Sequence, residues 1–224
     1  FMSGSALWAE ILCGVLSLVL AVGYHFFLAL EIWKWPYRVS LGVNIQERQA
    51  WALKIMTKEG KEILGVQSAR NSLIASTLLA SSALVIAFEM IKEFVALDEG
   101  GTIDSVQTGA AMLCIAFLLC SFFFFSMSIR AAHHVSFLVC SHTWHDCDES
   151  VLDIIGSKSR NQTLEDRVRI VVGTMKSHTL HFSAGMRCMY LAVPAGLWLL
   201  GPWWLLGSTV AIITFVAALD HKVL

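Results

Sequence analysis

The densest group of residues that could do chemistry lies in one polar segment after an apolar run. Its candidate ligands are Cys140, His142, His145 and Cys147. Thiolate and imidazole are both zinc ligands, so these four side chains could hold one ion. However, they form no C-x2-C pair, and their crowded spacing is not that of a known zinc finger. We therefore expect an ordinary polar segment and no cofactor, with zinc as the alternative.

A second group consists of arginines at the ends of apolar segments, and it comprises Arg70 with the adjacent Asn71, Arg130 and Arg187. A guanidinium fork binds phosphate and other anions, including lipid head groups. The sequence predicts that the three arginines lie at one membrane level and bind such an anion. The alternative is that Arg70 only anchors a helix at the membrane surface and Asn71 caps the helix start.

Ionisable residues inside apolar runs are rare, and three can be named: Glu10, His25 and Glu89. The two glutamates could share a cation or a proton, or they could simply reach the membrane surface. No apolar run carries a carboxylate or lysine at its middle, which weakens the case for a proton pump. The chain also lacks a nucleotide-binding loop, a nucleophile elbow and an HExxH sequence. We therefore expect no enzyme.

The composition is that of a membrane protein. Hydrophobic residues make up 56% of the 224 residues and charged residues 15%, whereas a soluble domain carries about 25% charged residues. The net charge of −1 gives no case for nucleic-acid binding. The expected partners are the lipid bilayer and other membrane subunits, or further copies of the chain.

The apolar runs predict an all-α transmembrane bundle with four to five spans in a single domain, 1–224. A span needs about 20 apolar residues. The last stretch is broken at Gly201-Pro202, where the chain either turns back as a hairpin or continues as an interfacial helix. The predicted spans are 6–30, 72–91, 109–129, 186–200 and 203–219.

Loop charges predict the orientation. The segments 34–70 and 130–187 are rich in lysine and arginine, and the short segment 93–104 is acidic. The positive-inside rule places both long segments in the cytoplasm and the N-terminus outside. Apolar residues at helical spacing in both segments predict amphipathic helices there. The sequon at Asn161 would then lie inside and stay unmodified.

Small residues recur at four-residue spacing on the second predicted span, at Ser72, Ser76 and Ala80. Small faces let helices approach closely in lipid. We expect this face to pack against another helix of the same chain rather than against another subunit.

The chain resembles a plant, algal and bacterial family of multi-pass membrane proteins known as domain of unknown function 599. The resemblance covers nearly the whole chain, except for the Cys- and His-rich stretch after Arg130. It is carried by Gly23-Tyr24-His25, Gly42-Val43-Asn44, Arg48-x-x-Trp51, Val66-Gln67-Ser68-Ala69-Arg70-Asn71, Phe124-Phe125-Ser126-Met127-Ser128-Ile129-Arg130, Tyr190-x-Ala192-x-Pro194 and Leu197-Trp198-x-x-Gly201-Pro202. It implies a multi-pass helical fold and no particular activity.

Three functions compete on this basis. The first is a structural or accessory subunit of a membrane assembly, which the uncharged spans and the aromatic residues of the last stretch favour. The second is an oligomeric channel or transporter for an ion or small solute. The third is a metal-binding or enzymatic membrane protein that uses the loop histidines and cysteines. We rank the accessory subunit first.

Overall fold

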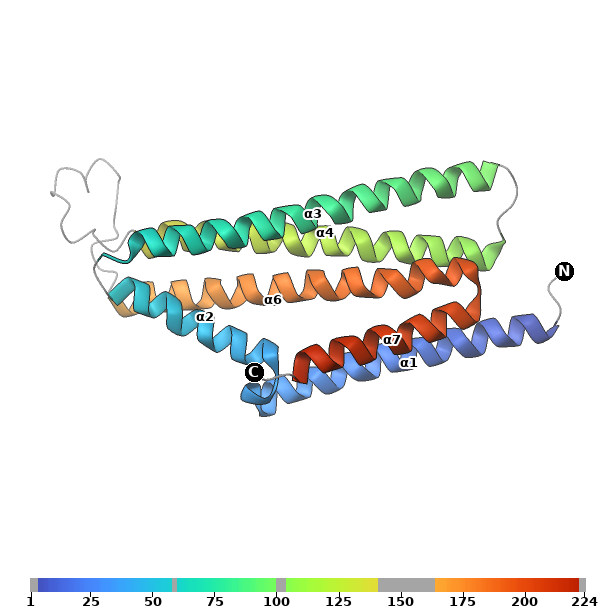
Figure 1. The fold of residues 1–224 in the computed structure, drawn as a ribbon, viewed down its shortest axis with the longest axis horizontal. Helices are drawn as coiled ribbons and strands as arrows, with labels where there is room; N and C mark the ends of the chain where they lie inside the picture. Colours follow the sequence, from blue (N-terminus) through green and yellow to red (C-terminus); the bar gives the residue numbers. More distant parts are fainter. Residues whose placement is uncertain (1–3, 58–59, 100–103, 141–163, 222–224) are drawn as a thin grey trace. The chain divides into compact units, whose positions relative to one another are not determined.

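The computed structural model describes residues 4–57, 60–99, 104–140 and 164–221. All the elements within these ranges are helices (Figure 1). They are α1 (Gly4–Lys34), η1 (Pro36–Arg38), α2 (Ser40–Thr57), α3 (Glu62–Glu99), α4 (Ser105–Cys140), α6 (Leu164–Leu197), η4 (Trp198–Leu200) and α7 (Pro202–His221).

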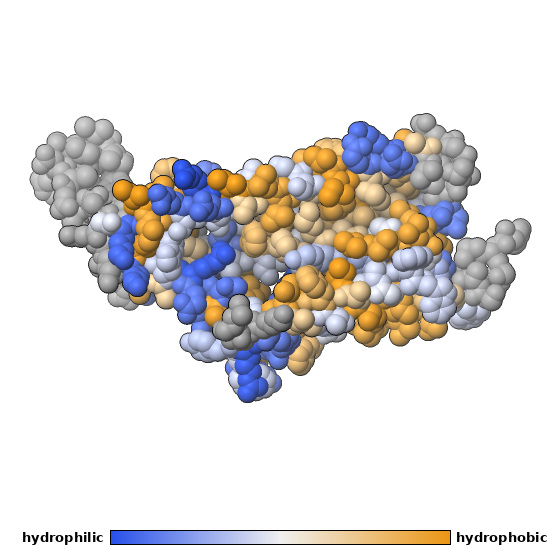
Figure 2. All heavy atoms as spheres, viewed as in Figure 1, coloured by the Kyte–Doolittle hydropathy of each residue, from blue (hydrophilic) through white to orange (hydrophobic). Residues whose placement is uncertain are grey.

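Four of these helices are long and apolar enough to cross a membrane. The qualifying stretches are Trp8–Lys34, Ile63–Ala96, Ser105–Leu138 and Pro202–His221. Many of their large apolar side chains are exposed, as lipid-facing residues would be, and Figure 2 shows apolar side chains gathered over α1 and α7. The prediction of an all-α chain with several apolar membrane helices is confirmed.

The chain turns back at Gly201, which ends η4 with a φ of 127°. Glycine adopts this backbone conformation without the steric cost that a Cβ brings. Pro202 is the first residue of α7. A proline costs no hydrogen bond there, because the N–H groups of the first turn have no partner within the helix. The predicted turn at Gly201-Pro202 is therefore present, and α7 runs back as a helix of 20 residues.

The described chain divides into two compact units. The first unit contains Phe1–Val43, Leu79–Phe124 and Ser183–Leu224, and the second contains Asn44–Leu78 and Phe125–Phe182. Helices α3, α4 and α6 each contribute to both. Each unit is described by itself below.

The core of the first unit forms around the end of α6. Ala192 and Ala195 pack with Ala87 of α3 and with Cys114 and Leu118 of α4. Almost every residue from 183 to 199 is buried or half-buried. Because this part of α6 is shielded by other helices, it can carry polar groups that would be costly on a lipid-facing helix.

Helices α1 and α7 lie side by side and run parallel in the first unit (Figure 1). Near the start of α7, the Trp198 indole N–H donates to Glu10 of α1 at 2.7 Å. At the other end of α7, Ser40 donates to the Leu219 carbonyl oxygen at 2.8 Å. Glu10 is therefore held by Trp198, while Glu89 pairs with Lys92 on the surface.

A close backbone approach fixes the start of α2. A Cβ on Gly42 would lie 2.1 Å from the Pro36 carbonyl oxygen. Only glycine fits this contact between α2 and η1, because real Cβ atoms do not approach an oxygen so closely.

The core of the second unit is built on the amphipathic face of α2. Ala52, Ile55 and Met56 are buried against Val135 of α4 and Val171 of α6. The opposite side of α2 is exposed, for example at Leu53 and Lys54. The predicted amphipathic helices in the two basic segments are therefore present as α2 and as the first part of α6.

Candidate anion site in the second unit

A buried histidine joins three helices of the second unit. His178 of α6 is 2% exposed. Its Nε2 lies 2.8 Å from the Ser72 hydroxyl of α3, and its Nδ1 lies 2.8 Å from the Ser128 hydroxyl of α4 and 3.0 Å from the Ser128 carbonyl oxygen. All of these polar atoms are satisfied by one another, as buried polar groups require.

The pattern of partners assigns the proton on a neutral His178 ring. A carbonyl oxygen can only accept, so Nδ1 carries the proton and donates it toward Ser128. Nε2 is then the acceptor, and the Ser72 hydroxyl donates to it. The Ser128 hydroxyl in turn donates to the His178 carbonyl oxygen at 3.3 Å.

A cavity of about 360 Å³ opens beside this histidine. Its size falls within the range of small-ligand sites. Residues from α2, α3, α4 and α6 line it, including Arg48, Trp51, Ser68, Ser72, Met175 and His178. The guanidinium of Arg48, the indole of Trp51 and the hydroxyl of Ser68 are all hydrogen-bond donors, so the lining favours an electron-rich ligand group.

Arg48 is the charged residue of this cavity. It is half-buried, and burial lowers its pKa. Within the described part of the chain, no carboxylate lies within ion-pair distance of its guanidinium. Burial also lowers the pKa of His178, and the positive charge of Arg48 lowers it further. The described residues therefore leave the positive charge of Arg48 uncompensated in this cavity, beside a neutral histidine.

The arginines expected to bind an anion are distributed differently. Arg70, Asn71 and Arg130 are exposed in the second unit. Arg70 lies two residues before Ser72 and Arg130 two residues after Ser128, which is about 3 Å along each helix. Because α3 and α4 run in opposite directions (Figure 1), these two arginines lie on the same side of His178.

Asn71 does not cap a helix. Helix α3 begins at Glu62, so Asn71 lies inside it, well past the first turn. The expectation of an Asn cap at this position is wrong. The apolar run begins at residue 72, but the backbone is already helical from Glu62.

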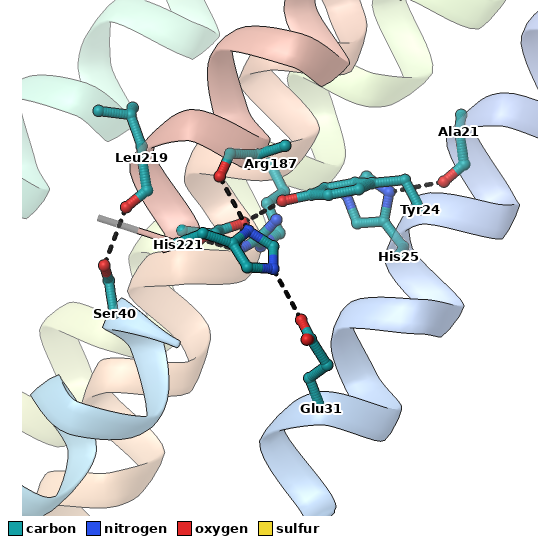
Figure 3. Close-up of polar contacts among 10 residues, drawn as sticks. Ala21, Tyr24, His25, Glu31, Ser40, Arg187, Leu219 and His221 are labelled. Carbon is teal, nitrogen blue, oxygen red and sulfur yellow. Dashed lines mark hydrogen bonds and ion pairs between the residues drawn. The ribbon is translucent and has the colours of Figure 1, made fainter. Parts of the chain in front are cut away.

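Arg187 belongs to the first unit and is paired within the chain (Figure 3). Its Nη2 donates to both carboxylate oxygens of Asp220 at 2.9 Å, and Tyr24 of α1 donates to the same carboxylate. His221 and Glu31 form a second contact nearby at 2.8 Å. The charge of Arg187 is therefore already balanced by an acid, in contrast to that of Arg48.

Three of the four expected zinc ligands lie outside the described residues. His142, His145 and Cys147 fall in the segment 141–163, which the described ranges omit, and Cys140 is the last residue of α4. In the described ranges, no group of three or more His, Cys, Asp or Glu side chains could hold a metal ion.

The small face expected on α3 is turned inward along most of its length. Ser76 and Ala80 are buried, as are Ala83 and Ala87 further along, whereas Ser72 is half-buried because it faces the cavity. Ser72 thus belongs to the hydrogen-bond network of His178 as well as to this face.

Two residues of the site were not anticipated. Arg48 was singled out only for its place in Arg48-x-x-Trp51. This spacing could have indicated a shared site, because it puts a cation and an indole about one helical turn apart on the same helix. His178 carried no comparable signal, since its partners are 106 and 50 residues away in the chain.

Comparison with known proteins gives one match. The family model described as "Protein of unknown function, DUF599" matches residues 12–223. No curated protein and no solved structure matches the chain.

Proposed function

The chain belongs to the DUF599 family, and we propose that it is an integral membrane protein that binds a phosphate-bearing anion in the cavity of the second unit. The observation that carries this proposal is Arg48, a half-buried cation with no carboxylate partner among the described residues. Removing a charge from water is costly unless an opposite charge accompanies it. A bound anion would supply that charge.

The other donors of the cavity fit the same ligand. Phosphate oxygens accept several charge-assisted hydrogen bonds at once, and arginine is well suited to them because of its planar fork. The Ser68 hydroxyl is a further donor with no partner in the described ranges. The Trp51 indole N–H is another, and indole rings favour membrane interfaces.

Two sources could supply the phosphate group, a lipid head group and a free anion. The purified full chain in detergent can be titrated with inorganic phosphate, with a short-chain phosphatidic acid and with the matching phosphatidylcholine. Unfolding temperature is the readout, because a ligand that binds the folded state raises it. Stabilisation by phosphatidic acid alone would identify a lipid, and stabilisation by phosphate as well would identify a free anion. If neither raises the unfolding temperature, the proposal fails.

A second proposal is an accessory role in a membrane assembly. It is supported by the exposed apolar face of α1, where Trp8, Leu18 and Phe26 are exposed by 73%, 64% and 65%. Either lipid or a helix of another subunit would cover such a face. Purification in mild detergent tests this proposal, because a stable foreign subunit should remain bound. A chain that elutes alone or only with copies of itself would argue against it.

A further inference from the structure

A second and larger cavity lies in the first unit, and its lining is almost entirely apolar. Its volume is about 580 Å³, and α1, α4, α6 and α7 all contribute to its walls. Along α1 it extends from Gly14 to Phe26, which is about 18 Å of helix. The cavity is therefore elongated, and it is formed mostly by helices that are apolar enough to lie in lipid.

One end of this cavity is closed by Trp198. The indole N–H is held by Glu10 at 2.7 Å. The indole ring lies against Gly14, where an added Cβ would be 3.9 Å from the nearest ring carbon. The ring is thus fixed against α1 and forms a wall at this end.

The other end carries an unused hydrogen-bond acceptor on His25. Nδ1 of His25 lies 2.7 Å from the Ala21 carbonyl oxygen, which can only accept. In a neutral ring Nδ1 therefore carries the proton, and Nε2 is left as an acceptor. Among the described residues, Nε2 has no hydrogen-bond partner.

A buried donor without a partner among the described residues lies in a neighbouring cavity, outside the lining of the larger one. His25 and Leu191 also line a small neighbouring cavity, and Arg187 lines that cavity with them. Asp220 occupies Nη2 of Arg187, while Nη1 is buried without a partner in the described ranges. In Figure 3 the hydrogen bond drawn from His25 runs to Ala21 and not to Arg187.

The charge balance limits what the ligand can be. Arg187 is neutralised by Asp220, so a ligand carboxylate or phosphate would bring an unpaired negative charge into an apolar site. A hydroxyl group has no charge and matches the unused acceptor on His25, which lines the cavity. Its proton can be donated to Nε2 of His25.

We propose that this cavity binds an elongated apolar alcohol of the sterol type, with its hydroxyl group at His25 and its hydrocarbon body extending toward Trp198. This site is separate from the proposed anion site, and neither proposal depends on the other. The fit rests on the length of the cavity, its apolar walls and the unused acceptor of His25 at one end.

Ser17 adds a feature that concerns ligand choice. It lines the cavity, is 6% exposed, and its hydroxyl has no partner among the described residues. It lies two helical turns from His25 on the same side of α1, about 12 Å away. A ligand with a second oxygen at that spacing gains a hydrogen bond, which predicts tighter binding of steroids that carry oxygen at both ends.

The test uses a photoreactive, alkyne-tagged cholesterol analogue and the full-length protein in detergent. Ala21→Phe fills the cavity between Ser17 and His25, and Leu113→Trp fills it from α4. Ala29→Phe adds the same ring on an exposed position of α1 and is the matched control. Labelling should fall about tenfold in both filling variants and stay unchanged in Ala29→Phe. Unchanged labelling in correctly folded filling variants would overturn the proposal.

The hydroxyl is tested by competition. Cholesterol should displace the probe about five- to tenfold better than the same hydrocarbon without its hydroxyl group, because it gains a hydrogen bond to His25. His25→Phe should abolish that difference. If the hydrocarbon competes as well as cholesterol, the cavity holds bulk lipid chains and the proposal is wrong.

Discussion

Arg187 of α6 places its Nη2 atom 2.9 Å from both carboxylate oxygens of Asp220 in α7, across the turn at Gly201. The two side chains are 14% and 11% exposed. Because Tyr24 donates to the same carboxylate, the pair ties α1, α6 and α7 together at one end of the first unit. An ion pair in this position fixes how the hairpin closes.

Replacing Asp220 alone should be more harmful than replacing the whole pair. Asp220→Asn leaves a buried guanidinium without an opposite charge, and breaking such a pair costs about 3–5 kcal/mol. The double variant Arg187→Met with Asp220→Leu removes both charges and should recover much of that loss. Denaturant unfolding in detergent measures the free energy of unfolding of the single and the double variant. Equal destabilisation by the single and double changes would contradict the importance of the unpaired charge.

Gly42 should not tolerate a side chain. The Gly42→Ala variant would place its Cβ 2.1 Å from the Pro36 carbonyl oxygen, and such overpacking costs about 1–3 kcal/mol. Gly23→Ala is the matched control, since a Cβ on Gly23 meets nothing within 4 Å. Thermal unfolding should show a lower transition temperature for Gly42→Ala only. An unchanged transition temperature for Gly42→Ala would contradict the close contact between Gly42 and Pro36 at the start of α2.

His178 should stabilise the second unit by joining three helices. His178→Phe leaves the hydroxyls of Ser72 and Ser128 without their shared partner, and unsatisfied buried groups cost about 1–3 kcal/mol. The variant should unfold at lower denaturant concentration. His133→Phe, at an exposed position of α4, serves as the control and should unfold like the unchanged protein.

The same histidine should make stability depend on pH. Burial and the nearby charges of Arg48 and His181 lower the pKa of His178 in the folded protein below its unfolded value of about 6.5. The unfolded chain then binds more protons, so stability is complete above pH 6.5 and falls as the pH drops below about 6.5. This decline should be smaller in His178→Phe. An identical pH profile in the two proteins would show that His178 does not cause it.

The predicted orientation can be read from glycosylation. With both basic segments inside, Asn161 in the sequon Asn161-Gln162-Thr163 should stay unmodified in a eukaryotic host, while an acceptor peptide fused ahead of residue 1 should be glycosylated. A shift in gel mobility that glycosidase removes is the readout. Glycan on Asn161 would show that the orientation is the opposite of the predicted one.

Much of the fold could be predicted because it follows from local patterns. Long apolar runs predict membrane helices, and Gly201-Pro202 predicts the turn between α6 and α7. The ends of the helices could not be predicted in this way, since α3 and α4 continue beyond their apolar runs as regular helices. Hydropathy marks the part of a helix that suits lipid and not the point where its backbone hydrogen bonds stop.

The candidate site was harder to predict from the sequence than the fold. Ser72, Ser128 and His178 meet only because three helices pack together, and no local pattern connects residues so far apart. Asp220 lies at the end of the last apolar stretch, and no local pattern connects it to Arg187, which lies 33 residues earlier in the chain. An arginine at a helix end looks the same in sequence whether it faces a ligand, water or an acid.

The proposed anion site is tested most directly by comparing two arginine variants of the second unit. Unfolding temperature is measured in detergent with and without short-chain phosphatidic acid for the unchanged protein, Arg48→Gln and Arg70→Gln. Arg70 is the matched control because it is exposed and does not line the cavity. We expect phosphatidic acid to stabilise the unchanged protein and Arg70→Gln alike and to have no effect on Arg48→Gln. Equal stabilisation of Arg48→Gln would contradict the assignment of the anion to this cavity.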